Sequence, residues 1–442
     1  MFEEFKNFID RRQLFHPDDK ILLAVSGGLD SMVMAYLFHH CKYRFAIAHC
    51  NFQLRGEASV LDEEFVGQVA EKYHVEFVSR RFETEKYARE QGISVQMAAR
   101  ELRYEWFEQL LVKLECRYLA TAHHLNDAFE TALFNLVKGT GLSGLRGITA
   151  KSQYRIRPLL FSDRKRIESF AVEQGVKWRE DQSNASVKYH RNFIRHKVVS
   201  LLEQINPDLI NSFSESARKI TAAENIVAAK TGEFKEKLVK TDGKDFYLDK
   251  KVLAEQQEGS FMLFQVLKPF GFNFSQACDI YDKLGHTGKR FLSKDYQLNV
   301  DRQALIVSPV SDNPVKEIFI EAGQQTVLGQ QFRLSLQQVS AEGFSIPNNK
   351  DTAALDFEKL KFPLKVRLWK KGDWFIPLGM KHKKKLSDFM IDEKIPLNLK
   401  LRVSVLQSSG DIVWVIGYRI DDRYKITSHS RQVFVVKKQM YD

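Results

Sequence analysis

A short turn that contains two glycines, two serines and one acid is the part of the sequence best suited to chemistry. An apolar run over residues 21–25 leads directly into Ser26-Gly27-Gly28-Leu29-Asp30-Ser31, and an apolar segment with helical spacing follows. Adjacent glycines allow a positive φ and leave no Cβ in the way of a bulky anion. The helix after the turn directs unpaired N–H groups to the same place, and the serine hydroxyls supply further donors. These residues are therefore predicted to bind phosphate.

Asp30 needs a separate explanation, because a carboxylate alone would repel a phosphate. We expect Asp30 to bind a bridging Mg²⁺. The alternative for the whole turn is an ordinary corner between a strand and a helix, in which Gly27 and Gly28 only make the corner tight. The turn is not a Walker A loop, since no Gly-Lys-Ser/Thr follows it, and it does not fit GxGxxG. Together with its flanking strand and helix, it resembles the pyrophosphate loop, SGGxDS, of the N-type ATP pyrophosphatases, which adenylate a substrate and release pyrophosphate.

Two pairs of charged residues are spaced to share one face of a helix, namely Asp127 with Glu130 and Arg100 with Arg103. Near a helix start, the two carboxylates could bind a cation or a substrate ammonium. They could equally be favourable first-turn acids that take no part in chemistry. The two arginines could clamp a phosphate or a target nucleotide, or they could form a solvated basic face.

The histidines and cysteines give little support for a metal centre. His123 and His124 follow a strand-like run and, being adjacent, should point to opposite sides, so polar roles in lining a site are favoured over a zinc pair. No CxxC pair occurs among the four cysteines, and a disulfide framework, a zinc finger and an iron–sulfur site are all poorly supported.

A basic segment near the C-terminus is predicted to contact nucleic acid. The chain carries a formal charge of +11, with a sequence pI of about 9.2. Residues 361–402 hold 12 Lys and Arg against 4 Asp and Glu, and the run 381–385, which contains Lys383, Lys384 and Lys385, is the densest part. Aromatic residues are interleaved there, as expected of a surface that contacts phosphates and unpaired bases. A solvated charged face is the alternative reading.

Strands and helices are predicted to alternate over residues 1–210. Apolar runs at 21–25, 45–49, 75–79 and 117–121 are separated by stretches with helical spacing. The alternation indicates an α/β fold with a doubly wound parallel sheet, in which ligands lie beyond the carboxyl ends of the strands. Ser59-x-x-Asp62 is expected to cap one of the helices.

The rest of the chain is expected to form two further domains. Residues 211–345 are predicted to be a mainly helical middle domain with a β-rich end, and residues 352–442 a small basic α+β domain that contacts nucleic acid. The stretch 345–351, SIPNNKD, is the best candidate linker. No apolar run approaches the roughly 18 residues of a membrane helix, and the start does not read as a signal peptide, so we expect a soluble, cytoplasmic protein without a membrane partner.

Several later segments resemble one family within the ATP pyrophosphatases, the tRNA(Ile)-lysidine synthetases. Phe52 and Asn126 depart from the family's common pattern, the second standing where a further Asp is frequent. The resemblance covers the whole chain in order and is weakest between about 215 and 350. The matching segments are 49–56 (HCNFQLRG), 98–104 (AARELRY), 121–131 (TAHHLNDAFET), 138–142 (KGTGL), 180–195 (EDQSNASVKYHRNFIR) and 372–392 (GDWFIPLGMKHKKKLSDFMID).

The resemblance implies a reaction and its substrates. ATP would adenylate the C2 oxygen of the wobble cytidine of a tRNA(Ile) with a CAU anticodon, and free L-lysine would then displace AMP to give lysidine. ATP and Mg²⁺ are the implied cofactors, and the oligomeric state is left open, a homodimer included.

The resemblance also implies roles for individual residues. The triphosphate would rest on the turn from Ser26 to Ser31, including Leu29, with Asp30 and Asp127 as catalytic residues that hold Mg²⁺. Arg100 would stabilise the α-phosphate or the target base. The residues implied in substrate binding are Glu130, His123, Arg103, Lys383, Lys384 and Lys385, with Glu130 positioning or deprotonating the lysine.

Three other functions fit parts of the sequence. A tRNA thiolase of the same superfamily also adenylates a base, but such enzymes usually rely on paired cysteines. A small-molecule ligase would not explain the basic C-terminal segment. A non-catalytic RNA-binding protein with a degenerate nucleotide fold would not explain the complete Ser-Gly-Gly-Leu-Asp-Ser turn.

Overall fold

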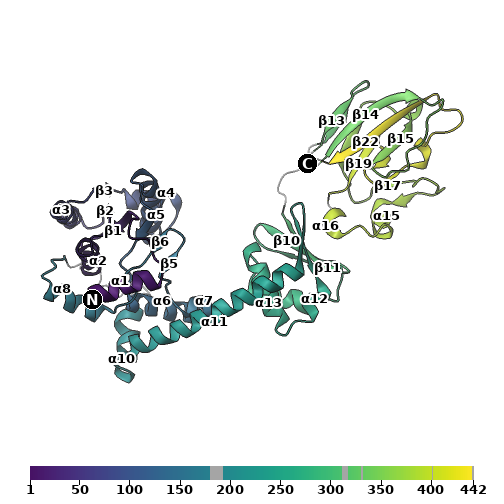
Figure 1. Cartoon of the computed structure of the whole chain (residues 1–442). Coiled ribbons are helices and arrows are strands. Elements are labelled where there is room, and N and C mark those ends of the chain that lie inside the picture. Colours follow the sequence, from purple (N-terminus) through teal and green to yellow (C-terminus); the bar gives the residue numbers. More distant parts are fainter. Residues whose placement is uncertain (180–192, 311–316, 330–331, 401, 441–442) are drawn as a thin grey trace. The chain divides into compact units, whose positions relative to one another are not determined.

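The computed structural model describes residues 1–179, 193–310, 317–329, 332–400 and 402–440. The chain divides into two compact units, residues 1–228 and residues 229–442 (Figure 1). Most of the segment 180–195, which the sequence analysis matched to the synthetases, lies outside the described residues. Among the residues described, no helix has both the length and the apolar character needed to cross a membrane.

The first unit is built on a sheet that confirms the predicted α/β fold. Its strand order is β3-β2-β1-β4-β6-β5, and every neighbouring pair is parallel except β5 with β6. Because β2 and β4 lie on opposite sides of β1, the strand order reverses at β1, which is where parallel sheets bind ligands. The strands are β1 (Ile21–Ala24), β2 (Phe45–Asn51), β3 (Phe77–Arg81), β4 (Tyr118–Ala120), β5 (Lys151–Ser152) and β6 (Arg155–Ile156).

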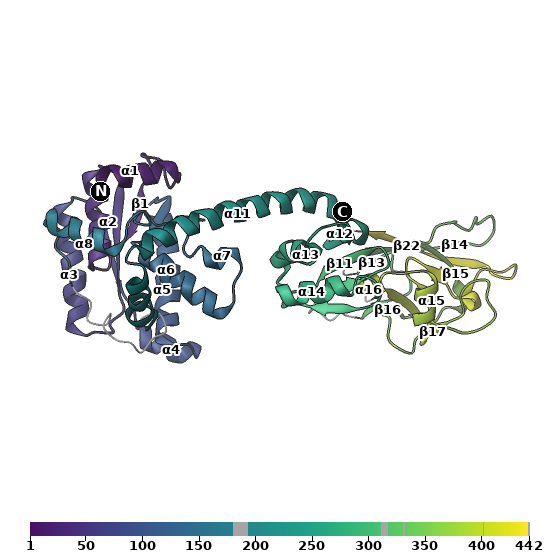
Figure 2. The same ribbon diagram turned by 90° about the horizontal axis from the view of Figure 1, so that it is seen from below.

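Helices cover both faces of this sheet. Successive residues of β1 point to opposite faces, and the apolar side chains on each face must be buried. Ile21 and Leu23 belong to one core and Leu22 to another, and all three side chains are fully buried. Figure 2 shows helices on both sides of β1. The first core is formed with α1 (Phe2–Arg11), α2 (Leu29–His40), α3 (Glu57–Lys72) and α8 (Arg164–Glu173), and the second with α5 (Val95–Lys113), next to α4 (Thr84–Gln91).

A third, smaller core joins the end of the first unit to α6 (Leu125–Lys138). Phe129 of α6 packs with Ile194, Val199 and Ile210, so the chain that follows the sheet is held against this helix. The other elements here are α7 (Leu142–Leu145), the π-helix η2 (Ile194–Val199), α10 (Ser200–Ile205) and the long α11 (Leu209–Leu238).

The second unit begins with a five-stranded sheet, which lies beside three short helices. Its hairpin β7–β8 lies near the start of residues 211–345, in the part that was predicted to be mainly helical. The turn at Asp242-Gly243 explains the difference, because Gly243 has φ +57° and connects two antiparallel strands. The elements are β7 (Val239–Asp242), β8 (Asp245–Asp249), α12 (Lys250–Ala254), α13 (Gly259–Leu267), η3 (Lys268–Phe270), α14 (Phe274–Asp282), β9 (Arg290–Leu292), β10 (Tyr296–Val300) and β11 (Ala304–Pro309).

Two antiparallel sheets and a small hairpin make up the rest of the second unit. β12 pairs with β16 and β14 pairs with β22, so strands on both sides of the candidate linker 345–351 share the same sheets. The strands are β12 (Ile318–Ile320), β13 (Thr326–Leu328), β14 (Phe332–Ser340), β15 (Thr352–Asp356), β16 (Leu364–Leu368), β17 (Trp374–Phe375), β18 (Lys384–Lys385), β19 (Ser404–Ser408), β20 (Asp411–Val415), β21 (Arg419–Ile420) and β22 (Gln432–Met440). The helices are η4 (Phe357–Lys359), α15 (Leu386–Asp392), α16 (Leu397–Lys400) and η5 (Asp422–Tyr424).

Candidate functional site

The glycine turn connects β1 to α2 and is braced from within by Ser31. The Ser31 hydroxyl donates a hydrogen bond to the Gly28 carbonyl oxygen at 2.9 Å and accepts one from the Ser26 N–H at 3.2 Å. The hydroxyl proton of Ser31 therefore points to the backbone of the turn, and Ser31 stabilises the shape of the turn to which it belongs. Gly27 has φ +90°, a conformation that side chains with a Cβ rarely adopt, whereas Gly28 has φ −78° at the start of α2.

Alanine substitutions at Gly27 and Gly28 are expected to have different effects on stability and on ATP affinity. Gly27→Ala should lower the free energy of unfolding by about 1 kcal/mol, because its backbone angle is strained for alanine. A Cβ at Gly28 would meet only the Ser26 hydroxyl at 3.6 Å, so Gly28→Ala should leave stability unchanged. The same Cβ would occupy space beside a bound phosphate, and ATP affinity should fall about 10-fold. Thermal unfolding and ATP titration of both variants test this. Unchanged ATP affinity in Gly28→Ala would contradict a phosphate site here.

Asp30 lies in the first turn of α2 and faces His124. Its Oδ1 is 3.7 Å from Nε2 of His124, and its Oδ2 is 3.4 Å from Nη1 of Arg164. Burial raises the pKa of Asp30, the charges of His124 and Arg164 lower it, and Asp127 raises it further. Oδ1 of Asp30 is buried and makes no hydrogen bond within the described part of the chain. A buried carboxylate oxygen in this state is suited to a cation.

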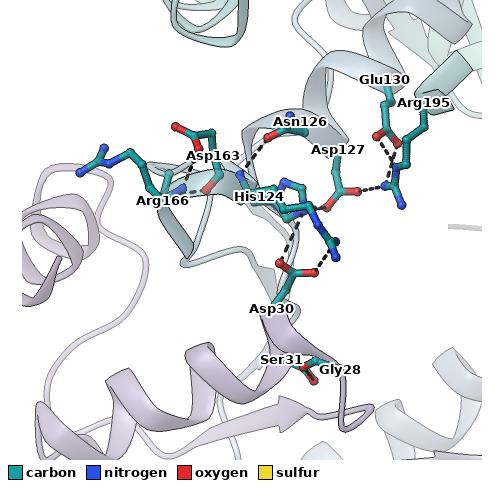
Figure 3. Close-up of polar contacts among 12 residues, drawn as sticks. Gly28, Asp30, Ser31, His124, Asn126, Asp127, Glu130, Asp163, Arg166 and Arg195 are labelled. Atoms are coloured by element: carbon teal, nitrogen blue, oxygen red, sulfur yellow. Dashed lines mark hydrogen bonds and ion pairs between the residues drawn. The ribbon is translucent and has the colours of Figure 1, made fainter. Parts of the chain in front are cut away.

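His124 brings the second predicted carboxylate to Asp30. Nε2 of His124 is 3.6 Å from Oδ2 of Asp127, and the same oxygen accepts a hydrogen bond from the His124 N–H at 3.1 Å. Figure 3 shows His124 between the two carboxylates. Asn126, which departs from the common pattern of the synthetases, accepts a hydrogen bond from the Arg164 N–H at 3.0 Å and so fixes the start of α8.

Glu130 lies one turn further along α6 and is bound by an arginine. Arg195 donates from Nε to Oε1 of Glu130 at 2.6 Å and from Nη2 to Oε2 at 3.0 Å, and Nη2 also contacts Oδ1 of Asp127 at 3.1 Å (Figure 3). Burial acts to lower the pKa of Arg195, but the bonds and charges of the carboxylates outweigh it and the pKa is raised. The two carboxylates thus lie on one face of α6, as their spacing predicts, and within the chain both contact Arg195.

A third acid, Asp62, holds two arginines beside the turn. It accepts hydrogen bonds from Nη2 of Arg55 at 2.7 Å and from Nε of Arg179 at 2.6 Å, and the Arg179 N–H donates to the Gly27 carbonyl oxygen. The expected cap Ser59-x-x-Asp62 is wrong, since α3 already begins at Glu57. One carboxylate between two guanidinium groups leaves a net positive charge near the turn, which favours an anion.

These groups surround a cavity of about 990 Å³ in the first unit. The structure thereby brings together most residues that the sequence analysis singled out, but Gly27 and Glu130 do not line this cavity. The predicted residues that do are Ser26, Gly28, Leu29, Asp30, Ser31, Arg100, Arg103, His123 and Asp127. Other residues line the cavity but were not predicted from the sequence to do so. They include Arg55, Arg164, Trp178, Arg179, Arg195 and His196. Arg195 belongs to the matched segment 180–195, which is the signal that could have identified it.

Another part of the cavity lining combines arginines with aromatic rings. The Arg103 guanidinium carbon lies 5.0 Å from the centre of the Phe52 ring, and that of Arg100 lies 5.1 Å from the centre of the Tyr104 ring. Nδ1 of His123 is 2.9 Å from the Thr121 hydroxyl oxygen. Flat cationic and aromatic surfaces of this kind can stack on a nucleobase.

A cation at Asp30 and Asp127 would need oxygen ligands from a bound phosphate. Within the described residues, no group of three or more His, Cys, Asp and Glu side chains is arranged to hold a metal ion. Mg²⁺ commonly uses one or two carboxylates together with substrate phosphates. The orphaned Oδ1 of Asp30, next to the glycine turn, fits that mode of binding.

In the second unit, the three predicted lysines have different surroundings. Nζ of Lys383 lies 3.7 Å from the centre of the Trp374 ring, and the same ring lies near Arg423. Lys384 pairs with Asp392, whereas Lys385 is exposed. The hairpin β17–β18 therefore presents a cationic and aromatic surface, with one of its charges already paired.

Comparisons with known proteins match the whole chain. A family model described as a PP-loop domain matches residues 2–202, one described as a TilS substrate binding domain matches 241–310, and one described as a TilS substrate C-terminal domain matches 364–436. A tRNA(Ile)-lysidine synthase of Bacteroides thetaiotaomicron is 36% identical, covering 97% of this chain and 98% of the relative. One of Parabacteroides distasonis is 37% identical, covering 99% of both. Of solved structures, a U34-tRNA thiolase from Methanococcus maripaludis matches 49% of this chain and 78% of its own at 19% identity, with a TM-score of 0.41.

Proposed function

Because this chain belongs to the tRNA(Ile)-lysidine synthase family, we propose that it adenylates the wobble cytidine of tRNA(Ile) and then attaches L-lysine. It is an ATP-dependent ligase that modifies tRNA and carries a PP-loop domain. The proposed substrates are a tRNA(Ile) with a CAU anticodon and free L-lysine, and the proposed compartment is the cytoplasm. The observation that carries the proposal is the single cavity that joins the glycine turn, Asp30, Asp127 and Arg100.

The reaction needs two steps because the C2 oxygen of cytosine is a poor leaving group. In the first step this oxygen attacks the α-phosphorus of ATP, and pyrophosphate departs. In the second step the ε-amine of lysine attacks C2, the C–O bond breaks, AMP departs and the amine loses a proton. The products are lysidine, AMP and pyrophosphate.

The residues of the first unit can be given roles in these steps. The turn from Ser26 to Ser31 would hold the triphosphate through its backbone N–H groups. Asp30 and Asp127 would hold Mg²⁺, which neutralises charge on the departing pyrophosphate. Arg100 would stabilise charge on the α-phosphate or position the cytosine against Tyr104.

The lysine is proposed to enter near the carboxylates of α6. Asp127 lines the cavity but Glu130 does not, so Glu130 would position or deprotonate the lysine amine only after Arg195 has moved away from it. Because Arg195 already holds both carboxylates, the ammonium of lysine would have to compete with a guanidinium group for them. Lysine should therefore bind weakly as long as Arg195 remains paired with these carboxylates.

Mass analysis of tRNA tests the proposed function directly. Transcribed tRNA(Ile) with a CAU anticodon is incubated with the enzyme, ATP and isotope-labelled lysine. We expect the anticodon fragment to gain the mass of labelled lysine less water, with one AMP formed for each lysine attached. A methionine tRNA serves as the control. Consumption of ATP without attachment of lysine would overturn the proposal.

The basic hairpin of the second unit is proposed to contact tRNA. Replacing Lys383, Lys384 and Lys385 with alanine should lower tRNA affinity about 10-fold at moderate salt and reduce its salt dependence, because phosphate contacts are lost. ATP binding should be unchanged.

A matched variant controls for the loss of three charges. Lys235, Lys237 and Lys240 are exposed on α11 and β7, so their replacement with alanine removes the same charge elsewhere in the second unit. Filter binding over a salt series compares the two variants. An equal loss of affinity in both would show that only net charge matters.

A further inference from the structure

Arginines converge on Tyr104 at the edge of the first-unit sheet. The guanidinium carbons of Arg100 and Arg155 lie 5.1 and 5.2 Å from the centre of the Tyr104 ring. Arg155 begins β6, and Arg157 follows the carboxyl end of that short strand. The carboxyl ends of parallel strands lie at one edge of a sheet, so Arg157 stands on the same edge as the glycine turn, whereas Arg155 is level with Leu22 in the middle of β1.

No carboxylate forms an ion pair with this group within the described residues, although Glu108 accepts a hydrogen bond from Tyr154, whose ring centre lies 5.6 Å from the Arg155 guanidinium carbon. Arg100, Arg155 and Arg157 take part in none of the ion pairs found there, although Nη1 of Arg157 donates to the Thr149 carbonyl oxygen at 2.7 Å. The Nε atoms of Arg155 and Arg157 are buried without a hydrogen-bond partner. Burial lowers the pKa of Arg157, Tyr104 raises it, and the charges of Arg155 and Arg100 lower it further. Like charges that are partly removed from water are costly unless an anion joins them.

Among the other arginines around the cavity, Arg103 lies against the Phe52 ring without an ion pair in the described part of the chain, but those near the glycine turn pair with acids. Arg164 contacts Asp30, Arg179 contacts Asp62, and Arg195 contacts Asp127 and Glu130. The chain therefore supplies acids to the arginines near the glycine turn but not to those around Tyr104. This contrast indicates that the anion for the Tyr104 group comes from a ligand.

We propose that Arg155 and Arg157, next to Arg100, bind a backbone phosphate of the RNA strand whose target base enters the cavity. This inference rests on the proposed function. Arg100 and Tyr104 line the cavity and Arg155 and Arg157 do not, so an anion held by Arg155 and Arg157 would lie outside the cavity, next to Arg100 and Tyr104. The planar fork of a guanidinium matches phosphate oxygens, and aromatic faces beside it suit an unpaired nucleotide. A phosphodiester fits better than a nucleotide tail, because the glycine turn already provides the site for ATP.

The test measures tRNA binding by Arg155→Gln and Arg157→Gln over a salt series. Each variant should bind tRNA about 10-fold more weakly, and the slope of log K against log salt should become shallower by about 1. ATP affinity without tRNA should stay as in the wild type. Arg89→Gln, on an exposed arginine of α4, removes the same charge and should change tRNA affinity less than about 2-fold.

Further measurements keep the test decisive. Because Arg157 is partly buried, its variant is checked by thermal unfolding, and Arg157→Lys is made beside it. Arg157→Lys keeps the positive charge but loses the planar guanidinium group. The salt dependence of tRNA binding should therefore return to that of the wild type, whereas tRNA affinity should recover only in part.

The outcomes separate this inference from the proposed function. Wild-type affinity and salt slope in both glutamine variants would overturn the inference, as would an equal loss in Arg89→Gln. Lysine attachment by the wild-type enzyme is measured in the same preparation. If the wild type attaches no lysine, the proposed function fails. If it does and the variants bind tRNA normally, only the phosphate site fails.

Discussion

Replacement of Asp30 with alanine is expected to abolish tRNA-dependent exchange of pyrophosphate with ATP, by at least about 10³-fold, while the fold stays intact. Asp30 is the acid of the glycine turn, and its buried Oδ1 is the atom best placed to hold a cation against the triphosphate. Exchange of labelled pyrophosphate measures the adenylation step alone. Asp10→Ala, at an exposed acid of α1, is the control and should exchange at the wild-type rate. Near-normal exchange by Asp30→Ala would overturn the assignment.

The stability of Asp30→Asn shows whether the loss is functional. Burial raises the pKa of Asp30 in the folded state, so the folded state favours the protonated acid. The stability linked to that proton is present at low pH and is lost as the pH rises through the raised pKa. Once it is ionised, the Asp30 carboxylate therefore opposes folding. Asp30→Asn should unfold at the same temperature as the wild type or above it, although it is inactive.

Replacement of Arg195 with methionine should lower the free energy of unfolding of the first unit by about 2 kcal/mol. The side chain of Glu130 is only 3% exposed, and without Arg195 its carboxylate would be buried next to Asp127 with its main charge partner removed. Arg195 itself is 29% exposed, so solvent moderates the loss. Urea unfolding measures the change. Wild-type stability in this variant would contradict the buried pair.

A second substitution separates lost charge pairing from lost packing. In Arg195→Met with Glu130→Gln, the uncompensated carboxylate is gone, and most of the lost stability should return. If the double variant is as unstable as Arg195→Met, the loss reflects packing against α6 instead.

Local patterns were enough to predict the sheet and its turn. The apolar runs at 21–25, 45–49 and 117–121 each became a parallel strand, because a strand covered on both faces requires nearly continuous apolar residues. The spacing of Asp127 and Glu130 placed both on one face of α6, since residues three apart are neighbours on a helix.

Contacts between distant residues could not be predicted in this way. Arg164 meets Asp30 across 134 positions, and Arg195 meets Glu130 across 65, so no local spacing indicates either pair. The hairpin β7–β8 was missed because helix-forming residues surround its short Asp-Gly turn. Asp62 was assigned to a cap because its partners, Arg55 and Arg179, could be identified only in three dimensions.

The position of β1 determines how nucleotide binding should be lost when the protein is heated. This strand lies between two neighbours within its sheet and between two separate cores, and the glycine turn grows directly from its end. Such a strand opens only when the surrounding unit melts as a whole. On heating, the glycine turn and the fold of the first unit should therefore be lost in one transition, without an inactive but folded intermediate.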